Sequence, residues 1–401
     1  MKIVIAGAGQ AAASLAARLR ALDANVEIVV IGEEPVAPYQ RPPLSKGYLL
    51  GEMPLDRLTL RADEWWQENR IELRKAERVL AIDPSAREIE TTRGRERYDA
   101  LALTLGAAAR RLPAAMGGER EGVHVVRSLA DIDALAPELR PGRRLVVVGG
   151  GYIGLEAAAV ARKLGLEVTV VEAGPRILGR VASEPMADRI RALQQGHGVD
   201  IVELAGVSEL AGAARVEAVH LTDGRELPCD LAICGIGVLP ETALAGEAGL
   251  ALDNGIAVDA FGRTSDPAIW AAGDCASFPH EGRRLRLESV GNAIDMAEAV
   301  AANILGAGKP YIPRPWFWSD QFDAKLQIAG LATGADHEVV REGEGGHGAS
   351  VWSFAGPRLL CVEALNDARA YMVGKRLIDA GRSADPAAVA DPATDLKALM
   401  R

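Results

Sequence analysis

The chain has 401 residues, 49% of them apolar and 25% charged, a balance typical of globular proteins that divide into two or three domains. Its formal net charge of −10, without any basic run, argues against a nucleic-acid-binding surface. No run of about 18 uncharged apolar residues occurs, so no membrane span is predicted, and because the N-terminus has no export-signal pattern we expect a cytoplasmic protein.

A glycine-rich turn follows the first predicted strand, residues 2–6. Three small residues there have the spacing G-x-G-x-x-A: Gly7, Gly9 and Ala12. The first permits a tight turn, the second lets the backbone approach a pyrophosphate, and the third lets the following helix, residues 11–22, pack on the strand. The helix N-terminus offers N–H groups and positive partial charge to phosphates. The next strand, residues 26–31, ends just before Glu33 and Glu34, and an acid there accepts hydrogen bonds from a ribose hydroxyl.

The same order of elements recurs in the middle of the chain. A strand over residues 145–148 leads into a full G-x-G-x-x-G: Gly149, Gly151 and Gly154. A helix over residues 155–164 and a strand over residues 168–171 come next, and Glu172 closes that strand. A carboxylate at that place favours the free 2′-hydroxyl of NADH and repels the 2′-phosphate of NADPH. Two such turns predict two bound dinucleotides, and the pair that makes chemical sense is a nicotinamide that gives a hydride and a flavin that accepts it.

A third element ends in Gly273 and Asp274, after a buried strand predicted over residues 269–272. On turn preferences alone, this Gly-Asp pair indicates a surface turn.

The cysteines show no metal-binding or redox pattern. None forms a C-x-x-C pair or is placed with histidines for zinc: Cys229, Cys234, Cys275 and Cys361. We therefore predict no metal site and four buried free thiols, since a free cysteine behaves as a small hydrophobe.

Six stretches spread over nearly the whole chain carry a family resemblance. They are PYQRPPLSK (38–46), VVVGGGYIGLEAA (146–158), GIGVLPE (235–241), NGIAVDAFGRTSDPAIWAAGDCA (254–276), ESVGNA (288–293) and PWFWSDQ (315–321). In these stretches the chain resembles the FAD- and NAD(P)-dependent reductases of the glutathione-reductase type. More narrowly, it resembles the ferredoxin reductases that serve aromatic-ring dioxygenases and bacterial cytochromes P450.

The resemblance implies an α/β fold of three domains. Two are Rossmann-like dinucleotide-binding domains, and the third is a C-terminal α+β domain. The FAD-binding domain would comprise residues 1–110 and 243–312, and the NADH-binding domain residues 111–242. The C-terminal domain would comprise residues 313–401.

The resemblance also implies a set of FAD contacts. The adenosine end would meet Ala11 and Glu33, although Glu34 is an adjacent alternative. Asp274 would bind the ribitol chain, and Val290 would lie at the flavin ring, where a helix starting near Asn292 stabilises negative charge on the reduced ring. Further positions that match family contacts are Arg41, Lys46, Val79, Arg127 and Gly273. Where the family usually has A-T-G, this chain has Thr104-Leu105-Gly106, so the resemblance assigns no specific contact to these residues.

Four residues are the candidates for catalysis. Lys46 and Glu156 would form a partly buried pair near the flavin, each holding the other in its charged state, and Glu156 would also bind the nicotinamide amide. The alternative for Glu156 is a solvated helix carboxylate. Tyr152 would gate the nicotinamide face. Trp318 would approach the flavin where a ferredoxin docks, or else serve as a core tryptophan.

No cysteine precedes Cys229, so the thiol chemistry of many relatives is not expected, and electrons must leave the flavin directly. The resemblance implies that the acceptor is a [2Fe–2S] ferredoxin. A local basic patch would receive it, with the candidates Arg283, Arg284, Arg286, Lys309 and Arg314. Rubredoxin, a quinone or monodehydroascorbate are alternative acceptors. A flavoprotein of the apoptosis-inducing-factor type, with a binding or signalling role, is an alternative of another class.

Overall fold

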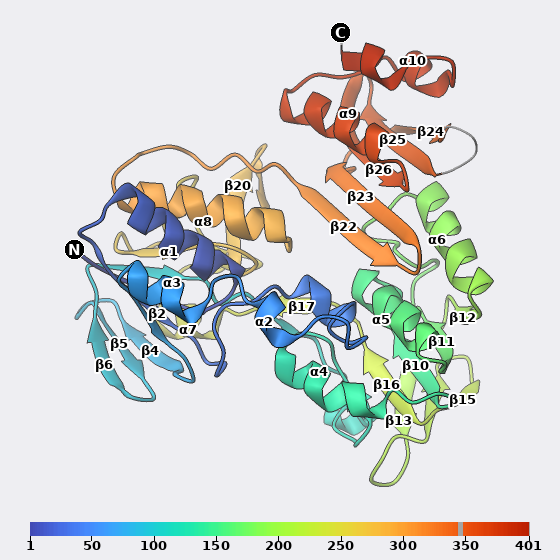
Figure 1. The fold of residues 1–401 in the computed structure, drawn as a ribbon, viewed down its shortest axis with the longest axis horizontal. Coiled ribbons are helices and arrows are strands. Elements are labelled where there is room, and N and C mark those ends of the chain that lie inside the picture. The colour runs from blue at the N-terminus through green and yellow to red at the C-terminus, as the bar shows by residue number, and fades with distance from the viewer. Residues whose placement is uncertain (344–347, 401) are drawn as a thin grey trace. The chain divides into compact units, whose positions relative to one another are not determined.

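The computed structural model describes residues 1–343 and 348–400 and is shown in Figure 1. The chain forms two units, each assembled from segments that are distant in sequence. Unit 1 comprises Met1–Arg41, Pro54–Ala108 and Val238–Pro315. Unit 2 comprises Pro42–Met53, Ala109–Gly237 and Trp316–Arg401. Strands β8 (Ala107–Ala109) and β17 (Val238–Pro240) lie where the chain passes from one unit to the other.

Unit 1 is built around a parallel sheet of apolar strands. Its order is β19-β7-β1-β2-β3, with the bounds Ile269–Ala271, Ala100–Leu103, Lys2–Ala6, Glu27–Ile31 and Ile71–Arg74. Strand β1 is fully buried from Ile3 onward, as expected of a parallel strand that is covered on both faces. Helices α1 (Gln10–Leu22) and α8 (Val290–Ile304) pack side by side in this unit (Figure 1).

Smaller elements complete unit 1. One three-stranded sheet consists of β4 (Val79–Asp83), β5 (Glu88–Thr91) and β6 (Gly94–Arg97). Another consists of β18 (Ile256–Ala257), β20 (Ala276–His280) and β21 (Arg283–Leu285). The short helices are α2 (Leu55–Leu58), α3 (Asp63–Glu68) and α7 (Ala243–Glu247).

Unit 2 contains a second parallel sheet of the same kind. Its order is β12-β11-β10-β16-β9, with the bounds Val199–Val202, Glu167–Val171, Arg144–Val148, Leu231–Cys234 and Val123–His124. The helices of this part are α4 (Leu129–Leu135), α5 (Tyr152–Lys163) and α6 (Glu184–Gly196). A small antiparallel sheet has β13 (Val207–Ala211), β14 (Ala218–Leu221) and β15 (Glu226–Pro228). The 3₁₀ turns are η1 (Pro42–Ser45), η2 (Ala114–Met116) and η3 (Ala136–Glu138).

An antiparallel sheet forms the rest of unit 2. Its order is β22-β23-β26-β25-β24, with the bounds Trp316–Gln321, Ala324–Gly330, Arg358–Leu365, Ala349–Ala355 and His337–Glu342. Helix α9 (Ala368–Asp379) packs on β23 and β26, and α10 (Pro386–Ala390) and η5 (Leu396–Met400) follow it. Strand β22 contacts α5 and strand β25 contacts α6, so this sheet packs against helices of the nucleotide-binding part within the same unit (Figure 1).

The α/β fold class predicted from the sequence is confirmed, with corrections to two helix starts. Helix α5 begins at Tyr152 and not at residue 155, because the last glycine of the turn lies inside the helix. Helix α8 begins at Val290, slightly before Asn292, because Ser289 caps it and accepts a 3.1 Å hydrogen bond from the N–H of Asn292. Within residues 1–343 and 348–400, no helix has the length and apolar character needed to cross a bilayer.

Candidate active site

The first glycine turn, in unit 1, is closed on one side and open on the other. Gly7 has φ +98°, and a Cβ there would stand 2.4 Å from the carbonyl oxygen of Thr104. A Cβ at Gly9, which caps α1, would meet no atom within 4 Å. Ala12 is fully buried at the start of α1. The open space at Gly9 and the N–H groups at the start of α1 therefore fit the pyrophosphate of a dinucleotide.

The second turn, in unit 2, repeats this geometry. Gly149 has φ +106°, and a Cβ there would stand 2.4 Å from the carbonyl oxygen of Gly235. A Cβ at Gly151, which caps α5, would meet nothing within 4 Å. A Cβ at Gly154 would stand 2.2 Å from the carbonyl oxygen of Gly149, so the helix packs on the turn only because this residue has no side chain. Both turns thus have the shape that a dinucleotide needs.

Glu172 is held rigidly at the end of β11. Its Oε2 accepts a 2.8 Å hydrogen bond from the N–H of Gly150, and its Oε1 accepts a 2.7 Å bond from the N–H of Gly174. These bonds fix the carboxylate at the carboxyl end of the parallel sheet, where Rossmann-like domains bind the ribose of a nucleotide.

The two acids after β2 have different surroundings. Glu34 accepts hydrogen bonds of 2.7 Å from the hydroxyl of Tyr39 and from Nη2 of Arg41, so its carboxylate is already engaged. The side chain of Glu33 is 68% exposed, and its ion pair with Arg78 is long, at 3.8 Å. Glu33 is therefore the acid with free acceptor positions for a ribose.

The other predicted cofactor residues are distributed over both units. Val79 opens β4 and is buried. Arg41 belongs to unit 1, where it pairs with Glu34 as described above. Arg127 belongs to unit 2, where it immediately precedes Ser128, the residue that caps α4.

Thr104 occupies the position where the sequence departs from the family pattern. Its hydroxyl lies 3.1 Å from the carbonyl oxygens of Ala6 and Gly7 and donates to them. It therefore fixes the end of β1 and the beginning of the turn, so the hydroxyl has a structural role within the protein.

Gly273 and Asp274 follow β19 next to α1. Gly273 has φ +81°, and a Cβ there would stand 3.1 Å from the Cβ of Ala11, which explains why both positions carry small residues. Asp274 comes next, and its carbonyl oxygen accepts a 3.4 Å hydrogen bond from Nη1 of Arg286. Val290 is the first residue of α8. Unit 1 thus brings the first turn, Asp274 and the N-terminus of a long helix into one region.

The predicted pair of Lys46 and Glu156 is present in unit 2. Glu156, on α5, is 2% exposed, and its Oε2 lies 2.8 Å from Nζ of Lys46. The same oxygen accepts a 2.5 Å hydrogen bond from the hydroxyl of Ser45, and Oε1 accepts a 2.7 Å bond from the hydroxyl of Ser319. The solvated-carboxylate alternative for Glu156 is therefore wrong.

Burial raises the pKa of Glu156, while the charge of Lys46 and the hydrogen bonds from Lys46, Ser45 and Ser319 oppose that rise. The charged form thus depends on its partners, because an unpaired buried carboxylate would take up a proton.

The polar network continues beyond Glu156 through residues that the sequence did not single out. The hydroxyl of Ser319 accepts a 3.1 Å hydrogen bond from Nε2 of Gln321, whose Oε1 accepts a 2.8 Å bond from Gln194 on α6. Strand alternation could have revealed this face, since Ser319 and Gln321 are two residues apart on β22 and point to the same side.

Tyr152 and Trp318 lie on different sides of β22. Tyr152, on α5, stacks on Phe317 with ring centroids 4.4 Å apart, and its hydroxyl donates a 3.1 Å hydrogen bond to the carbonyl oxygen of Val181. Phe317 shares its strand face with Ser319. Trp318 lies on the opposite face, where it stacks on Trp316 at 5.4 Å and is only partly buried. Trp318 is therefore neither a fully buried core residue nor part of the Glu156 network.

The cysteines are all free and buried, as predicted. Burial raises the pKa of Cys229 to about 12 and that of Cys234 and Cys275 to about 11. It also raises the pKa of Cys361 well above its usual value. These thiols stay protonated at neutral pH and are poor nucleophiles. In the part of the chain that the structure describes, no cluster of metal-binding side chains occurs.

Two candidates for the basic patch are occupied. Arg286 is 11% exposed and bonds to Glu288 at 2.5 Å. Arg284 donates a 2.9 Å hydrogen bond to the carbonyl oxygen of Val258 and also bonds to Ser277. The inclusion of Arg286 in an exposed patch is therefore wrong. Arg284 is exposed although it is hydrogen-bonded, and Arg283, Lys309 and Arg314 are exposed as well.

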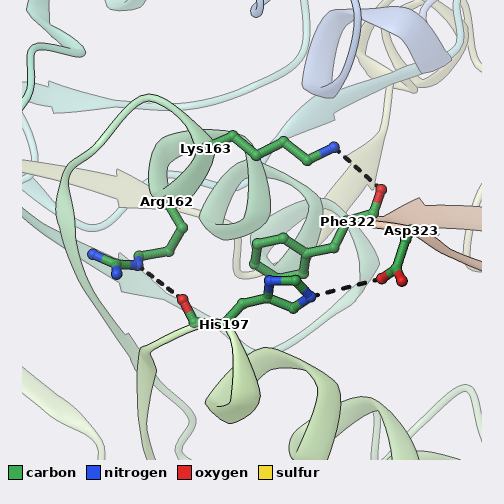
Figure 2. A pocket seen from close by; sticks show the side chains of 5 residues that line it. All are labelled: Arg162, Lys163, His197, Phe322 and Asp323. Carbon is green, nitrogen blue, oxygen red and sulfur yellow. Dashed lines mark hydrogen bonds and ion pairs between the residues drawn. The ribbon is translucent and has the colours of Figure 1, made fainter.

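A separate pocket of about 270 Å³ lies in unit 2 and is lined by residues other than the predicted site residues. Figure 2 shows the His197 ring lying flat on that of Phe322, with centroids 3.8 Å apart. Lys163 donates to the carbonyl oxygen of Phe322, and Arg162 to that of His197, at 3.1 and 3.2 Å. Asp323 completes the lining. Both cations are bonded to backbone carbonyls, so the residues that line this pocket mainly connect α5, the end of α6 and the β22–β23 turn.

Two family models match the chain in succession. The pyridine nucleotide-disulphide oxidoreductase model matches residues 1–297, and the reductase C-terminal model matches residues 316–400. The anthranilate 1,2-dioxygenase system ferredoxin–NAD(+) reductase component of Burkholderia cepacia is 40% identical over an alignment of 405 positions that covers 99% of this chain and 98% of that protein. Rubredoxin-NAD(+) reductase of Ectopseudomonas oleovorans is 37% identical over an alignment of 370 positions that covers 91% of this chain and 96% of that protein.

The crystal structure of the covalent putidaredoxin reductase–putidaredoxin complex is similar over the whole chain. The TM-score is 0.95 at 36% identity, and the match covers 100% of this chain and 98% of that chain. Both glycine turns, the parallel sheets and the antiparallel C-terminal sheet agree with these matches. The chain therefore belongs to the pyridine nucleotide-disulphide oxidoreductase family and is an oxidoreductase that uses FAD and NAD(H).

Proposed function

We propose that this protein is a ferredoxin–NAD(+) reductase that passes electrons from NADH through FAD to a [2Fe–2S] ferredoxin. That ferredoxin would feed an aromatic-ring dioxygenase or a cytochrome P450, and the reaction would take place in the cytoplasm. The observation that carries the proposal is the buried Lys46–Glu156 pair in a chain whose four thiols are all buried and protonated. The names of the full-length relatives support the acceptor.

Each cofactor has residues in one unit that suit it. FAD would lie on the first turn, with Glu33 at the ribose, Asp274 at the ribitol chain and Val290 with the α8 N-terminus at the flavin ring. NADH would lie on the second turn, with Glu172 at the ribose. FAD, when bound, accepts the hydride of NADH as an electron pair and gives up electrons singly, which matches a one-electron acceptor.

The protein would contribute positioning more than proton transfer. Glu156 has about four acceptor positions, and three are taken by Ser45, Lys46 and Ser319. The position left on Oε1 would accept the amide N–H of the nicotinamide. Lys46 would keep the carboxylate charged, so that the ring is held in one orientation during hydride transfer.

The remaining assignments follow from the same proposal. Tyr152, at the start of α5, would close one side of the nicotinamide site. Trp318, on the outward face of β22, would lie where the ferredoxin docks. The domains would be residues 1–110 with 243–312 for FAD, 111–242 for NADH and 313–401 for the C-terminal domain.

The test is reduction of cytochrome c by NADH with purified holoenzyme. We expect a low rate by itself and a large increase when a [2Fe–2S] ferredoxin is added, because the cluster relays single electrons. Ferricyanide, which needs no protein partner, serves as the control for the NADH-to-FAD half of the reaction.

The alternatives predict other outcomes of that test. Stimulation by a rubredoxin, without stimulation by any ferredoxin, would favour the acceptor named for the Ectopseudomonas relative. A slow, long-lived charge-transfer colour on adding NADH would favour a flavoprotein of the apoptosis-inducing-factor type. Protein that takes up no flavin would contradict the whole proposal.

A further inference from the structure

The loop that joins β11 to α6, residues 173–183, follows Glu172 directly. In Rossmann-like domains the nucleotide crosses the carboxyl ends of the parallel strands, and loops that leave those ends border it. This loop therefore borders the adenosine half of the NADH that the proposed function places on the second turn. Its backbone is unusual at Leu178, which is buried and has φ +54°, a region that L-residues disfavour. Such a conformation persists only when surrounding contacts hold it.

The end of this loop is held by a carboxylate from the C-terminal sheet. Glu363, on β26, is 1% exposed. Its two oxygens lie 2.9 and 3.1 Å from the backbone nitrogen of Ser183, and the Ser183 hydroxyl also donates to Oε2. Ser183 is the N-cap residue of α6, but its hydroxyl makes no capping hydrogen bond to the helix because it donates to Glu363 instead. A negative charge there also suits the positive end of the α6 dipole.

A second contact ties the same loop to the C-terminal sheet. The hydroxyl of Tyr152 donates to the carbonyl oxygen of Val181, and the ring of Tyr152 stacks on Phe317 of β22. The loop is thus fastened at Val181 and at Ser183, in both cases through side chains that belong to or pack on the antiparallel sheet.

We infer that Glu363 is a positioning residue for NADH: by bonding to Ser183 it holds residues 173–183 in the conformation that accepts the adenosine half of the coenzyme. The inference rests on the proposed NADH site at the second turn. Glu363 would act on coenzyme affinity and leave the hydride step unchanged, because its contacts are to the loop backbone and to Ser183 and not to the Glu156 network.

The experiment measures NAD⁺ binding to the oxidised holoenzyme by calorimetry, together with KM for NADH and kcat with ferricyanide. For Glu363→Ala we expect Kd for NAD⁺ and KM for NADH to rise about fivefold, as for a site whose competent conformation is populated only about a fifth of the time. kcat at saturating NADH should stay within about twofold. Glu363→Gln and Ser183→Ala, which keep part of the bonding, should show smaller changes in the same direction.

Two comparisons make the result decisive. Ser353→Ala removes a buried hydroxyl on the adjacent strand β25 that bonds to none of the residues that the structure describes, and it should change neither constant. Glu172→Ala tests the site itself. If Glu172→Ala weakens NAD⁺ binding but none of the Glu363 and Ser183 variants does, the positioning role is refuted while the NADH site stands. If Glu172→Ala has no effect, the proposed NADH site fails as well.

A fall in kcat with unchanged Kd would also overturn the inference. If Glu363→Ala does not fold, Glu363→Gln and Ser183→Ala decide the question.

Discussion

At the scale of single residues, four glutamates in this protein differ because of what surrounds them. Glu33 faces solvent, and Glu172 is bound by two backbone N–H groups. Glu156 is buried beside a lysine, and Glu363 is buried against the backbone N–H and hydroxyl of Ser183. The same side chain is therefore suited to bind a ribose, to bind an amide, or to hold a loop.

The Lys46–Glu156 pair gives a first prediction. Lys46→Ala and Glu156→Ala should each lower the rate of flavin reduction by NADH at least about tenfold, since a charge-assisted hydrogen bond to the nicotinamide is lost. Stopped-flow absorbance at the flavin band measures this rate, and the FAD content should be unchanged. Lys163→Ala, which removes a lysine from the same unit outside the network, is the control. Wild-type rates in both variants would remove the pair from the mechanism.

Glu363 gives a second prediction, on stability against pH. Burial raises the pKa of Glu363 to about 6 from the ordinary 4.5. The hydrogen bonds from Ser183 and the charge of Arg176 oppose this rise, while the charge of Glu338 adds to it. Tyr152 and Cys361 are the other titratable groups that interact with Glu363. Because the folded state holds this proton more tightly, the stabilising contribution is fully present below about pH 4.5 and is lost as pH rises through about 6. The difference is about 2 kcal/mol.

Glu363→Gln stays neutral at every pH, so its free energy of unfolding should lack this component. In urea unfolding, the variant should gain about 2 kcal/mol relative to wild type between pH 4.5 and pH 7. A constant difference between the two proteins over that range would show that Glu363 does not titrate there. If the gain is observed, the variant loses less stability than the wild type on going to neutral pH and yet should bind NAD⁺ more weakly, the trade expected of a residue kept for function.

At the scale of elements, β22 shows how a strand serves two purposes. Its alternation directs Phe317, Ser319 and Gln321 to α5 and α6, and leaves Trp316 and Trp318 on the other face. The two-residue turn to β23 places Phe322 at φ +55°, which costs an L-residue about 1 kcal/mol. The stacking of His197 on Phe322 holds this turn in place.

The turn gives a third prediction. Phe322→Ala should lower the free energy of unfolding by about 1–2 kcal/mol, because the ring contact is lost and the disfavoured φ remains. Phe322→Gly should lose less than the alanine variant, since glycine adopts this φ without cost. Thermal unfolding of both variants measures the order, and an alanine variant more stable than the glycine variant would contradict the argument.

At the scale of the whole molecule, each unit is built from three separate stretches of chain. The segment Pro42–Met53, which carries Ser45 and Lys46, belongs to unit 2 although its neighbours in sequence on both sides belong to unit 1. Glu156 and the residues that hold it therefore come from three distant parts of the sequence.

The net charge gives a fourth prediction. A protein of charge −10 can receive an acidic ferredoxin only through a local positive surface, and Arg283, Lys309 and Arg314 are exposed in unit 1. The value of kcat/KM for ferredoxin should fall by roughly tenfold between about 20 and about 300 mM salt, because screening weakens the attraction. The rate of flavin reduction by NADH, which involves no ferredoxin, should change much less. A salt-independent kcat/KM would exclude electrostatic docking.

The sequence by itself determined the local features of this protein: both glycine turns, the strands and helices around them, and the lack of an available thiol. These depend on residue type and on spacing over about ten residues, which any chain shows before it folds. Only the tertiary structure decided that Glu34 is engaged and Glu33 free, that Ser45 and Ser319 complete the Glu156 network, and that Glu363 holds Ser183. These contacts join residues more than a hundred positions apart, or depend on which rotamer the packing permits, and no local pattern encodes either.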